Sequence, residues 1–469
     1  MRQKLLSVLV ALTLITVMLT GCGGSKTTGE TSNTPTGETD TGKEEASVEQ
    51  TVAQEGAGTD EKFENPVTIS CMVWSYADRT ASTDKWIKEC EEKFNIIIDL
   101  QNIPTDNYST VLKTKISAGD MPDIVSVHEI TKGFEAESMK IDENTFADLS
   151  GLENVANFSQ EVRDNVSING KLYYVPISQN ALGVLYNKKV FEDNGIAIPT
   201  NINEFTAAMD KLKTAGVAPL AGSFGEAWSA QIIPFLAFDN YVLGQDPDIP
   251  KKLYDSSTNV SEMRWSALGD NVNKALGLGK EWIDAGYFTD NPIGTDASVA
   301  CQLLATGKAA MFITGNWEYS VAAAATEEGT SIGFFPLPLN QPGDEIRIST
   351  AANEGMCINA NSKNLEAAKI ALDYYFSTEV QTAIMKDFGG VSTNATVTSE
   401  DPFVQEMSEA LNNNTLVPGG FFGGSDYLFP KSSSFNKEVE CQSLMAGLIT
   451  PEQFCEKMDQ AIAEVAEIK

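Results

Sequence analysis

The folded part of the chain opens with short β-rich runs that alternate with amphipathic helical runs. Three runs are apolar and β-rich, as in buried strands: 67–74, 94–100 and 123–127. Helical periodicity lies between them, at 84–94 and 108–118. The first of these helices places four residues on one face: Trp86, Ile87, Cys90 and Phe94. Asp106 is the expected N-cap of the second helix, which ends at Gly119. This β-α-β-α-β order predicts parallel strands joined by right-handed crossovers.

The same pattern returns later in the chain. Further strands are expected at 182–186 and 308–314, and further helices at 188–194 and 365–376. Asn201 is suited to cap a helix, because Glu204 follows three residues later as in a capping box. A last helix begins with Thr450 as N-cap and Pro451 at the first position. Its apolar stripe comprises Phe454, Met458, Ala461, Ile462 and Val465. The chain is therefore expected to be α/β.

The N-terminal pattern is that of a targeting segment. Arg2 and Lys4 precede an apolar run at 5–19, which is shorter than the roughly 20 residues needed to cross a bilayer. Leu19-Thr20-Gly21-Cys22 resembles the lipobox of bacterial lipoproteins, which implies a signal peptide at 1–21 and a diacylglycerol group on Cys22. An ordinary cleaved signal followed by a chance cysteine is the alternative. Residues 22–64 are rich in Gly, Ser, Thr and Glu and are expected to form a disordered acidic tether.

Charge and residue chemistry narrow the class of function. The net charge of −32 argues against nucleic-acid binding, which needs a basic surface. The single histidine, His128, leaves no usual zinc site, and no phosphate-binding or dinucleotide motif occurs. We therefore expect no cofactor, no metal and no catalytic residues. Six further cysteines are scattered without a CxxC pair: Cys71, Cys90, Cys301, Cys357, Cys441 and Cys455. Whether any of them form disulfides stays open at this point.

Four stretches resemble the extracytoplasmic sugar-binding proteins of bacterial ABC transporters, the family that includes maltose-binding protein. They are AGDMPDI at 118–124, GKLYYVPISQNALGVLYNKKVFEDNGIAIPTNINE at 170–204, GKAAMFITGNW at 307–317, and GFFPLP at 333–338 followed by GMCINANSKNLEAAKIALDYYFSTEVQ at 355–381. Ile202 departs from the tryptophan usual in the family, and Val127 lies where an aromatic residue is common.

The resemblance implies a two-lobed fold of the periplasmic-binding-protein type II, with a ligand cleft between lobes joined by hinge crossings. The first lobe would comprise 65–178 and about 337–386, and the second about 182–333 and 387–469. Crossings are expected near 176–182, 333–338 and 386–390. Closure of two rigid lobes around a ligand is the motion that such hinges allow.

A sugar offers apolar faces to aromatic rings and hydroxyl groups to carboxylates and amides. The resemblance implies that Trp317 stacks on sugar, and strand ends and hinge loops supply the other candidates. Trp86, Trp265 and Trp282 lie in helical patterns and are expected in the core. The full set of expected sugar-binding residues is Trp74, Ser75, Asp78, His128, Glu129, Gln179, Asn180, Trp228, Asn316, Trp317, Asn353 and Glu354, with Asp426 as a weaker candidate.

The resemblance thus implies a monomer on the extracytoplasmic face of a Gram-positive-type cell membrane. It would hand a mono- or oligosaccharide to permease subunits of an ABC transporter. Two alternatives remain. One is binding of a peptide or another small polar solute. The other is a secreted glycoside hydrolase, which would use two carboxylates about 5–10 Å apart.

Overall fold

The computed structural model of this chain describes residues 62–74, 76–127, 143–249, 252–253, 264–352, 354–418 and 435–467. The described residues all belong to one compact unit, 55–469. The expected signal peptide, Cys22 and almost all of the expected tether lie outside the described residues. No helix in the described ranges has the length and apolar character needed to cross a membrane.

The first sheet has the strand order β2-β1-β3-β10-β4. Its strands are β1 (Val67–Val73), β2 (Ile96–Asn102), β3 (Ile124–Val127), β4 (Val175–Pro176) and β10 (Gly355–Ile358). β1 runs parallel to β2 and β3, as expected from the β-α-β-α-β order, whereas β10 is antiparallel to β3 and β4. The helices around this sheet are α1 (Thr80–Phe94), α2 (Thr105–Ala118), α4 (Gln160–Val166), α13 (Leu365–Tyr375) and α14 (Thr378–Phe388). We call this sheet and its helices the first lobe.

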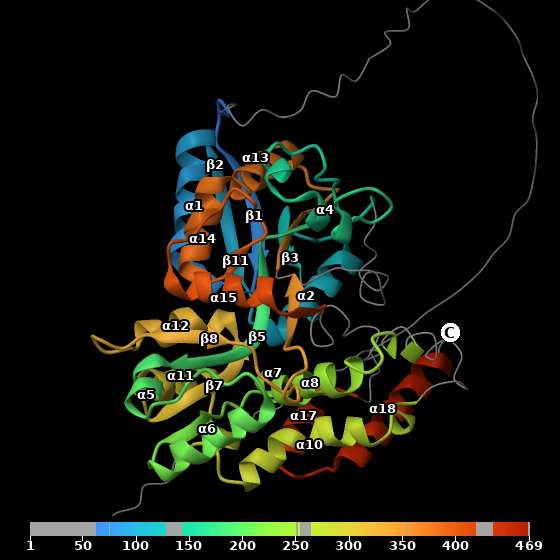
Figure 1. Ribbon diagram of the computed structural model, residues 1–469. Coiled ribbons are helices and arrows are strands. Elements are labelled where there is room, and N and C mark those ends of the chain that lie inside the picture. The colour runs from blue at the N-terminus through green and yellow to red at the C-terminus, as the bar shows by residue number, and fades with distance from the viewer. Residues whose placement is uncertain are drawn as a thin grey trace, which may run out of the picture. The chain divides into compact units, whose positions relative to one another are not determined.

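The second sheet has the strand order β12-β9-β5-β7-β6, and two further strands, β8 and β11, also pair with β5. The strands are β5 (Ser178–Asn187), β6 (Ala218–Ala221), β7 (Ala309–Gly315), β8 (Ile332–Phe335), β9 (Arg347–Ala352), β11 (Val391–Ser392) and β12 (Thr415–Pro418). Its helices are α5 (Lys188–Asp193), α6 (Ile202–Thr214), α7 (Ala227–Ala230), α8 (Ile232–Phe238), α10 (Asp270–Asp284), α11 (Ala297–Ala305), α12 (Tyr319–Ala324), α15 (Pro402–Asn413), α17 (Lys437–Met445) and α18 (Pro451–Glu467). We call this sheet and its helices the second lobe. Figure 1 shows how the long strand β5 leads into it.

Hydrophobic periodicity decides which faces of the helices are buried. On α1, Trp86, Cys90 and Phe94 lie in the core of the first lobe, with Ile87 packed against it, as predicted. On α18, the predicted stripe is buried from Phe454 to Ile462, while the side chain of Val465 lies outside the described set. Trp86, Trp265 and Trp282 are all buried, so their expected place in the core is confirmed.

Helix ends follow the predicted caps in two cases and differ in one. Asn201 Oδ1 accepts from Glu204 N–H at 3.1 Å, and Thr450 Oγ1 accepts from Gln453 N–H at 3.3 Å. The expected cap at Asp106 is wrong, because α2 already begins at Thr105 with Pro104 as the preceding residue. Pro104 fixes an extended backbone that starts the helix earlier.

The chain passes between the lobes at three places. Residue 177 separates β4 of the first sheet from β5 of the second, and Gly389 and Gly390 separate α14 from β11. Residue 177 agrees with the first expected crossing. After β11 the chain contacts the first lobe again, where Asn394 forms a bridge with Phe158, so the third crossing extends from 389 to the start of α15. The crossing expected at 333–338 is wrong: β8 pairs with β5 there, and the chain returns to the first lobe only between β9 and β10. Residues 337–352, expected in the first lobe, thus supply β9 to the second sheet.

Close packing accounts for the glycine at the start of the misplaced crossing. A Cβ on Gly333 would lie 2.4 Å from the Tyr186 ring. Gly333 therefore serves the close approach of β8 to β5, and the glycine does not mark a hinge. The six cysteines within the described part are free thiols and are buried, so the structure holds no disulfide among them.

Candidate functional site

The second lobe brings two of the predicted aromatic residues together. Trp317 lies on the short helix η6 (Asn316–Glu318) directly after β7, and Trp228 lies on α7. Their ring centroids are 6.2 Å apart, with the planes inclined by 54°. Both side chains are half-buried, and Trp317 packs against the cores of both lobes. This aromatic pair therefore stands where the two lobes approach each other.

Gly315 makes room for the Trp317 ring. A Cβ at this position would come within 2.0 Å of Trp317, which is far closer than atoms can pack. The last residue of β7 thus has no side chain because the indole ring folds back over the strand. The close approach of the Trp317 ring is therefore the steric reason for a glycine at position 315.

Two buried amide side chains lie beside the aromatic pair. Asn316 Oδ1 accepts from the N–H of Ala181 at 2.9 Å, which fixes η6 to the start of β5. Asn316 Nδ2 and Asn180 Oδ1 are both buried, and neither has a hydrogen-bond partner within the described part of the chain. Buried polar atoms without partners are uncommon because each costs free energy. One donor, on Asn316 beside Trp317, and one acceptor, on Asn180 of β5, are therefore without a partner, and a hydroxyl group can satisfy both kinds of atom.

Two further predicted residues lie on β5 and in the first lobe. Gln179 is half-buried and pairs with Val391 and Ala352 of the neighbouring strands. Trp74 follows β1, is half-buried, and meets the Tyr108 ring edge-on at 4.7 Å. Tyr108 in turn donates to the carbonyl of Met72 at 2.8 Å, and burial raises the pKa of its hydroxyl. Trp74 is thus held by a neutral, buried partner.

Glu354 has a different environment from the one expected. This carboxylate is buried and forms an ion pair with Arg79, whose side chain is only 4% exposed. Arg79 ends the short helix η1 (Tyr76–Arg79), which follows Trp74 and Ser75. Arg79 was not among the predicted residues, because no local pattern points to a partner that lies 275 residues away.

Several predicted residues lie outside the described residues. They are Ser75, His128, Glu129, Asn353 and Asp426, together with the side chain of Asp78. Among the described residues no group of three or more His, Cys, Asp or Glu side chains gathers in a metal-binding arrangement.

The helix after Trp317 is fixed by a second aromatic contact. Tyr319 stacks on Phe403 of α15 at 3.6 Å, with the planes only 6° apart. Burial, aided by the nearby Asp401 carboxylate, raises the pKa of Tyr319 to about 12. The phenol is therefore neutral at physiological pH.

A pocket of about 410 Å³ lies near the third crossing, between the end of α14, β11 and α15. Met385, Gly390, Val404 and Ser408 are among the residues that line it. None of the predicted sugar-binding residues does. We take the Trp228–Trp317 pair as the candidate site, because two predicted aromatic residues meet there and Trp317 packs against the cores of both lobes.

Two α/β lobes with three crossings, and aromatic and amide groups where they approach, define the class of two-lobed binding proteins. Residues 75–382 match the family described as bacterial extracellular solute-binding protein, and the chain belongs to this family. This membership places the protein outside the cytoplasm. The expected two-lobed, periplasmic-binding-protein-like fold is confirmed.

Relatives and solved structures agree with this assignment. The chain is 26% identical to the multiple sugar-binding protein of Streptococcus mutans over 63% of its own length and 67% of that protein's. It is 22% identical to the diacetylchitobiose binding protein DasA of Streptomyces coelicolor, over 75% and 78% of the two lengths. Its fold is similar to that of RafE in complex with raffinose, with a TM-score of 0.70 and 20% identity over 85% of this chain and 100% of that one. The fold is also similar to that of a sugar transporter from Bacillus licheniformis in complex with stachyose. The TM-score is 0.71 and the sequence identity is 18%, over 85% of this chain and 100% of that one.

Proposed function

We propose that this protein captures an oligosaccharide outside the cell and delivers it to the permease of an ABC transporter. The observation that carries the proposal is the Trp228–Trp317 pair beside the buried amide atoms of Asn180 and Asn316. Aromatic faces suit the apolar C–H surface of a sugar ring, and amide donors and acceptors suit its hydroxyl groups. Two aromatic rings at a site favour a ligand of more than one sugar unit.

Relatives support the same ligand class. The similar proteins carry names or titles that specify multiple sugars, diacetylchitobiose, raffinose and stachyose. A peptide or another small polar solute is the second candidate ligand. It is favoured less, because paired aromatic rings beside neutral amides fit a neutral ligand better than a charged one.

The remaining contacts of the proposed site come from both lobes. Trp74 and Gln179 would complete it among the described residues. The predicted residues Ser75, Asp78, His128, Glu129 and Asn353 stay part of the proposal. We assign to Glu354 a role within the protein, because its carboxylate is already engaged with Arg79.

The proposed action is capture without chemistry. The two lobes would close on the sugar around the three crossings, as rigid bodies joined by hinges do. The sugar would leave unchanged, so the protein would not be an enzyme, and it would act as a monomer. Hydrolysis of a glycan by the purified protein would contradict this.

We also propose that a lipid on Cys22 anchors the protein at the membrane, after removal of residues 1–21. Residues 22–64 would be the tether, and confinement near the permease would raise the effective concentration of the binder there. The Cys22→Ser protein should then appear in the medium, with reduced sugar uptake by the cells and unchanged sugar affinity in solution. A Cys22→Ser protein that stays with the membrane fraction would refute the lipid anchor.

The ligand class is tested by a thermal-shift screen of the Cys22→Ser protein. The panel comprises galactose- and glucose-containing oligosaccharides, chitin oligosaccharides, monosaccharides, peptides and divalent metals. A rise in Tm with an oligosaccharide supports the proposal. A rise with a peptide or a metal and with no carbohydrate would overturn it.

A further inference from the structure

The three crossings are tied together at the backbone of Ile177. Its N–H donates to the carbonyl of Glu354 at 3.2 Å, and its carbonyl accepts from Thr393 N–H at 3.3 Å. Thr393 Oγ1 also donates to the carbonyl of Pro176. We call these four residues, Pro176, Ile177, Glu354 and Thr393, the hinge junction. Each crossing contributes to it, so movement of one crossing changes the hydrogen bonds of the others.

The turn that follows Trp74 is attached to the hinge by two charged contacts. Arg79 Nη2 forms its ion pair with Glu354 Oε2, inside the junction itself. Three residues further on, the N–H of Ser82 donates to Asp387 Oδ2 at 2.7 Å. Asp387 lies at the end of α14, just before the third crossing. An acidic group at an N-terminal N–H of α1 is also favoured by the helix dipole.

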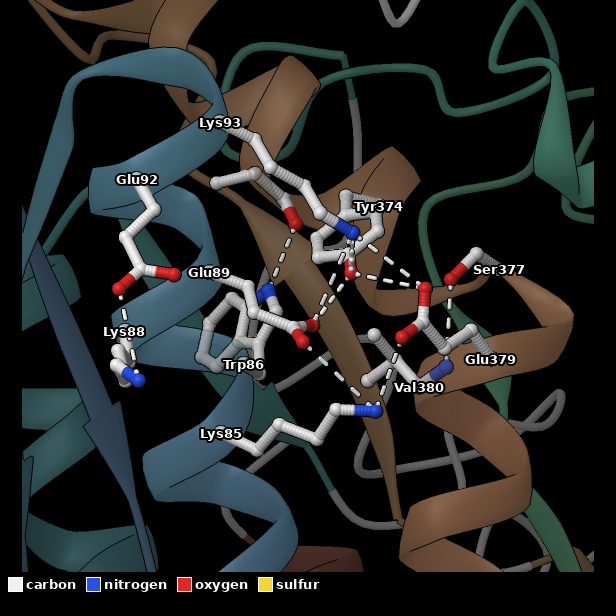
Figure 2. A network of polar contacts seen from close by, with 11 residues as sticks. Lys85, Trp86, Lys88, Glu89, Glu92, Lys93, Tyr374, Ser377, Glu379 and Val380 are labelled. Atoms are coloured by element: carbon white, nitrogen blue, oxygen red, sulfur yellow. Dashed lines mark hydrogen bonds and ion pairs between the residues drawn. The ribbon is translucent and has the colours of Figure 1, made fainter.

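The outer faces of α1 and α14 are joined as well. Figure 2 shows Lys85, Glu89 and Lys93 of α1 pointing toward Tyr374 and Glu379. Lys85 Nζ lies 3.0 Å from Glu379 Oε1, and the ammonium of Lys93 lies 4.3 Å from the centre of the Tyr374 ring. The indole N–H of Trp86 donates to the carbonyl of Ala371 at 3.0 Å. These contacts link α1 to α13 and to α14.

The chemistry of the Arg79–Glu354 pair argues for a positional role. Burial of two charges is costly, and replacing such a pair by apolar residues is often neutral or stabilising. Stability alone therefore gives little reason for the pair. A buried ion pair does impose one geometry on the elements that it joins, because loss of that geometry would leave two charges buried without partners.

We propose that Arg79 and Glu354 are positioning residues that couple the turn at Trp74 to the hinge junction. Contact of a sugar with Trp74 would hold η1 in one position. Through the ion pair, this restraint would reach the crossings and favour the closed arrangement of the lobes. This inference rests on the proposed function, since it needs a sugar at Trp74. Coupling requires that the ligand interact differently with the open and closed arrangements.

The decisive variant is the double replacement Arg79→Met with Glu354→Leu. It removes both charges together, so no unpaired charge is left buried, and the fold should be kept. Single variants Arg79→Met and Glu354→Leu complete a double-mutant cycle, and each should lower Tm by itself because it leaves one charge buried without its partner. The matched control is Lys85→Met with Glu379→Leu, which removes an exposed ion pair between α1 and α14, away from the junction.

Two measurements are made on each Cys22→Ser protein. The first is sugar affinity by calorimetry. The second is the distance between spin labels on Lys88→Cys of α1 and Lys189→Cys of α5, both exposed, with and without sugar. The native thiols do not interfere, because the six of the described part are buried.

The double variant should keep its Tm but bind sugar at least tenfold more weakly, with a smaller change in label distance at saturating sugar. The control variant should match the unsubstituted protein in sugar affinity and in the change of label distance. If the double variant binds sugar with full affinity and closes fully, the pair is only structural. That result would overturn this inference but not the proposed function. If the unsubstituted protein binds no sugar, the proposed function fails, and this inference fails with it.

Discussion

The indole rings of Trp228 and Trp317 lie 6.2 Å apart and are inclined by 54°, although the two residues are nearly 90 positions apart in the sequence. The pair joins α7 to the end of β7 in the second lobe. Trp317 also packs against the core of the first lobe. A ligand that contacts this pair therefore touches the region where both lobes approach.

Removal of the Trp317 ring should weaken sugar binding while the fold is kept. We expect Trp317→Ala to lose at least about 1.4 kcal/mol of binding free energy, or roughly tenfold in Kd. Calorimetric titration measures the loss. As a control, Trp86→Phe lowers Tm because Trp86 is buried in the first core, but leaves the Kd of the folded protein unchanged. Equal affinity of Trp317→Ala and the unsubstituted protein would remove Trp317 from the site.

The orientation of Trp317 depends on the missing side chain at Gly315. A methyl group there would meet the indole ring at 2.0 Å, so Gly315→Ala should turn the ring away from its present position and reduce sugar affinity about tenfold. Gly151→Ala is the matched control, because nothing lies within 4 Å of the added Cβ and its φ is not positive. The idea fails if both alanine variants bind sugar alike.

Replacement of Asn180 should weaken sugar binding without lowering the stability of the fold. Its Oδ1 is buried without a partner in the described part, so Asn180→Leu removes an unsatisfied acceptor at similar volume. We expect the Tm of the sugar-free protein to stay the same or rise, while sugar affinity falls at least about tenfold, since one hydrogen bond to the ligand is lost. A drop in Tm with unchanged affinity would instead mark Asn180 as structural.

The buried thiols should make stability fall at alkaline pH. Burial raises the pKa of Cys71 and Cys357 well above the ordinary value of 9.0. Because the folded state holds these protons more tightly, stability is complete below about pH 9 and decreases as the pH rises further, by about 1.4 kcal/mol per pH unit for each such thiol. Urea titrations between pH 7 and 10.5 measure this decrease.

The same burial predicts slow thiol chemistry. The Cys22→Ser protein should react with iodoacetamide at pH 8 only after denaturation, when six groups become modified.

A variant with Cys71→Ala and Cys357→Ala should show a smaller loss of stability at high pH. Equal loss in this variant would mean that other groups cause the alkaline effect.

Local features of the sequence predicted much of the fold. The periodicity of Trp86, Cys90 and Phe94 set the buried face of α1, and Asn201 and Thr450 marked two helix starts correctly. These signals depend on neighbours within one or two turns. The crossing expected near 333–338 was wrong, because nothing local in the sequence shows that β8 pairs with β5 and that Gly333 packs closely against Tyr186.

The candidate site was predictable only in part. Asn316 and Trp317 follow a clear strand, and their family resemblance pointed to the ligand. The ion pair of Arg79 and Glu354 could not be predicted from the sequence, because it depends on how β9 and β10 bring residue 354 to η1. Long-range pairing of this kind depends on the complete topology, which no local pattern contains.

The most direct test of the central claim is a calorimetric titration of the Cys22→Ser protein with the oligosaccharide that raises its Tm most. We expect a saturable heat with one sugar bound per protein, and the sugar should be recovered intact afterwards. Absence of saturable heat with any carbohydrate, or saturable heat with a peptide instead, would contradict the assignment of this protein as a sugar-capturing member of its family.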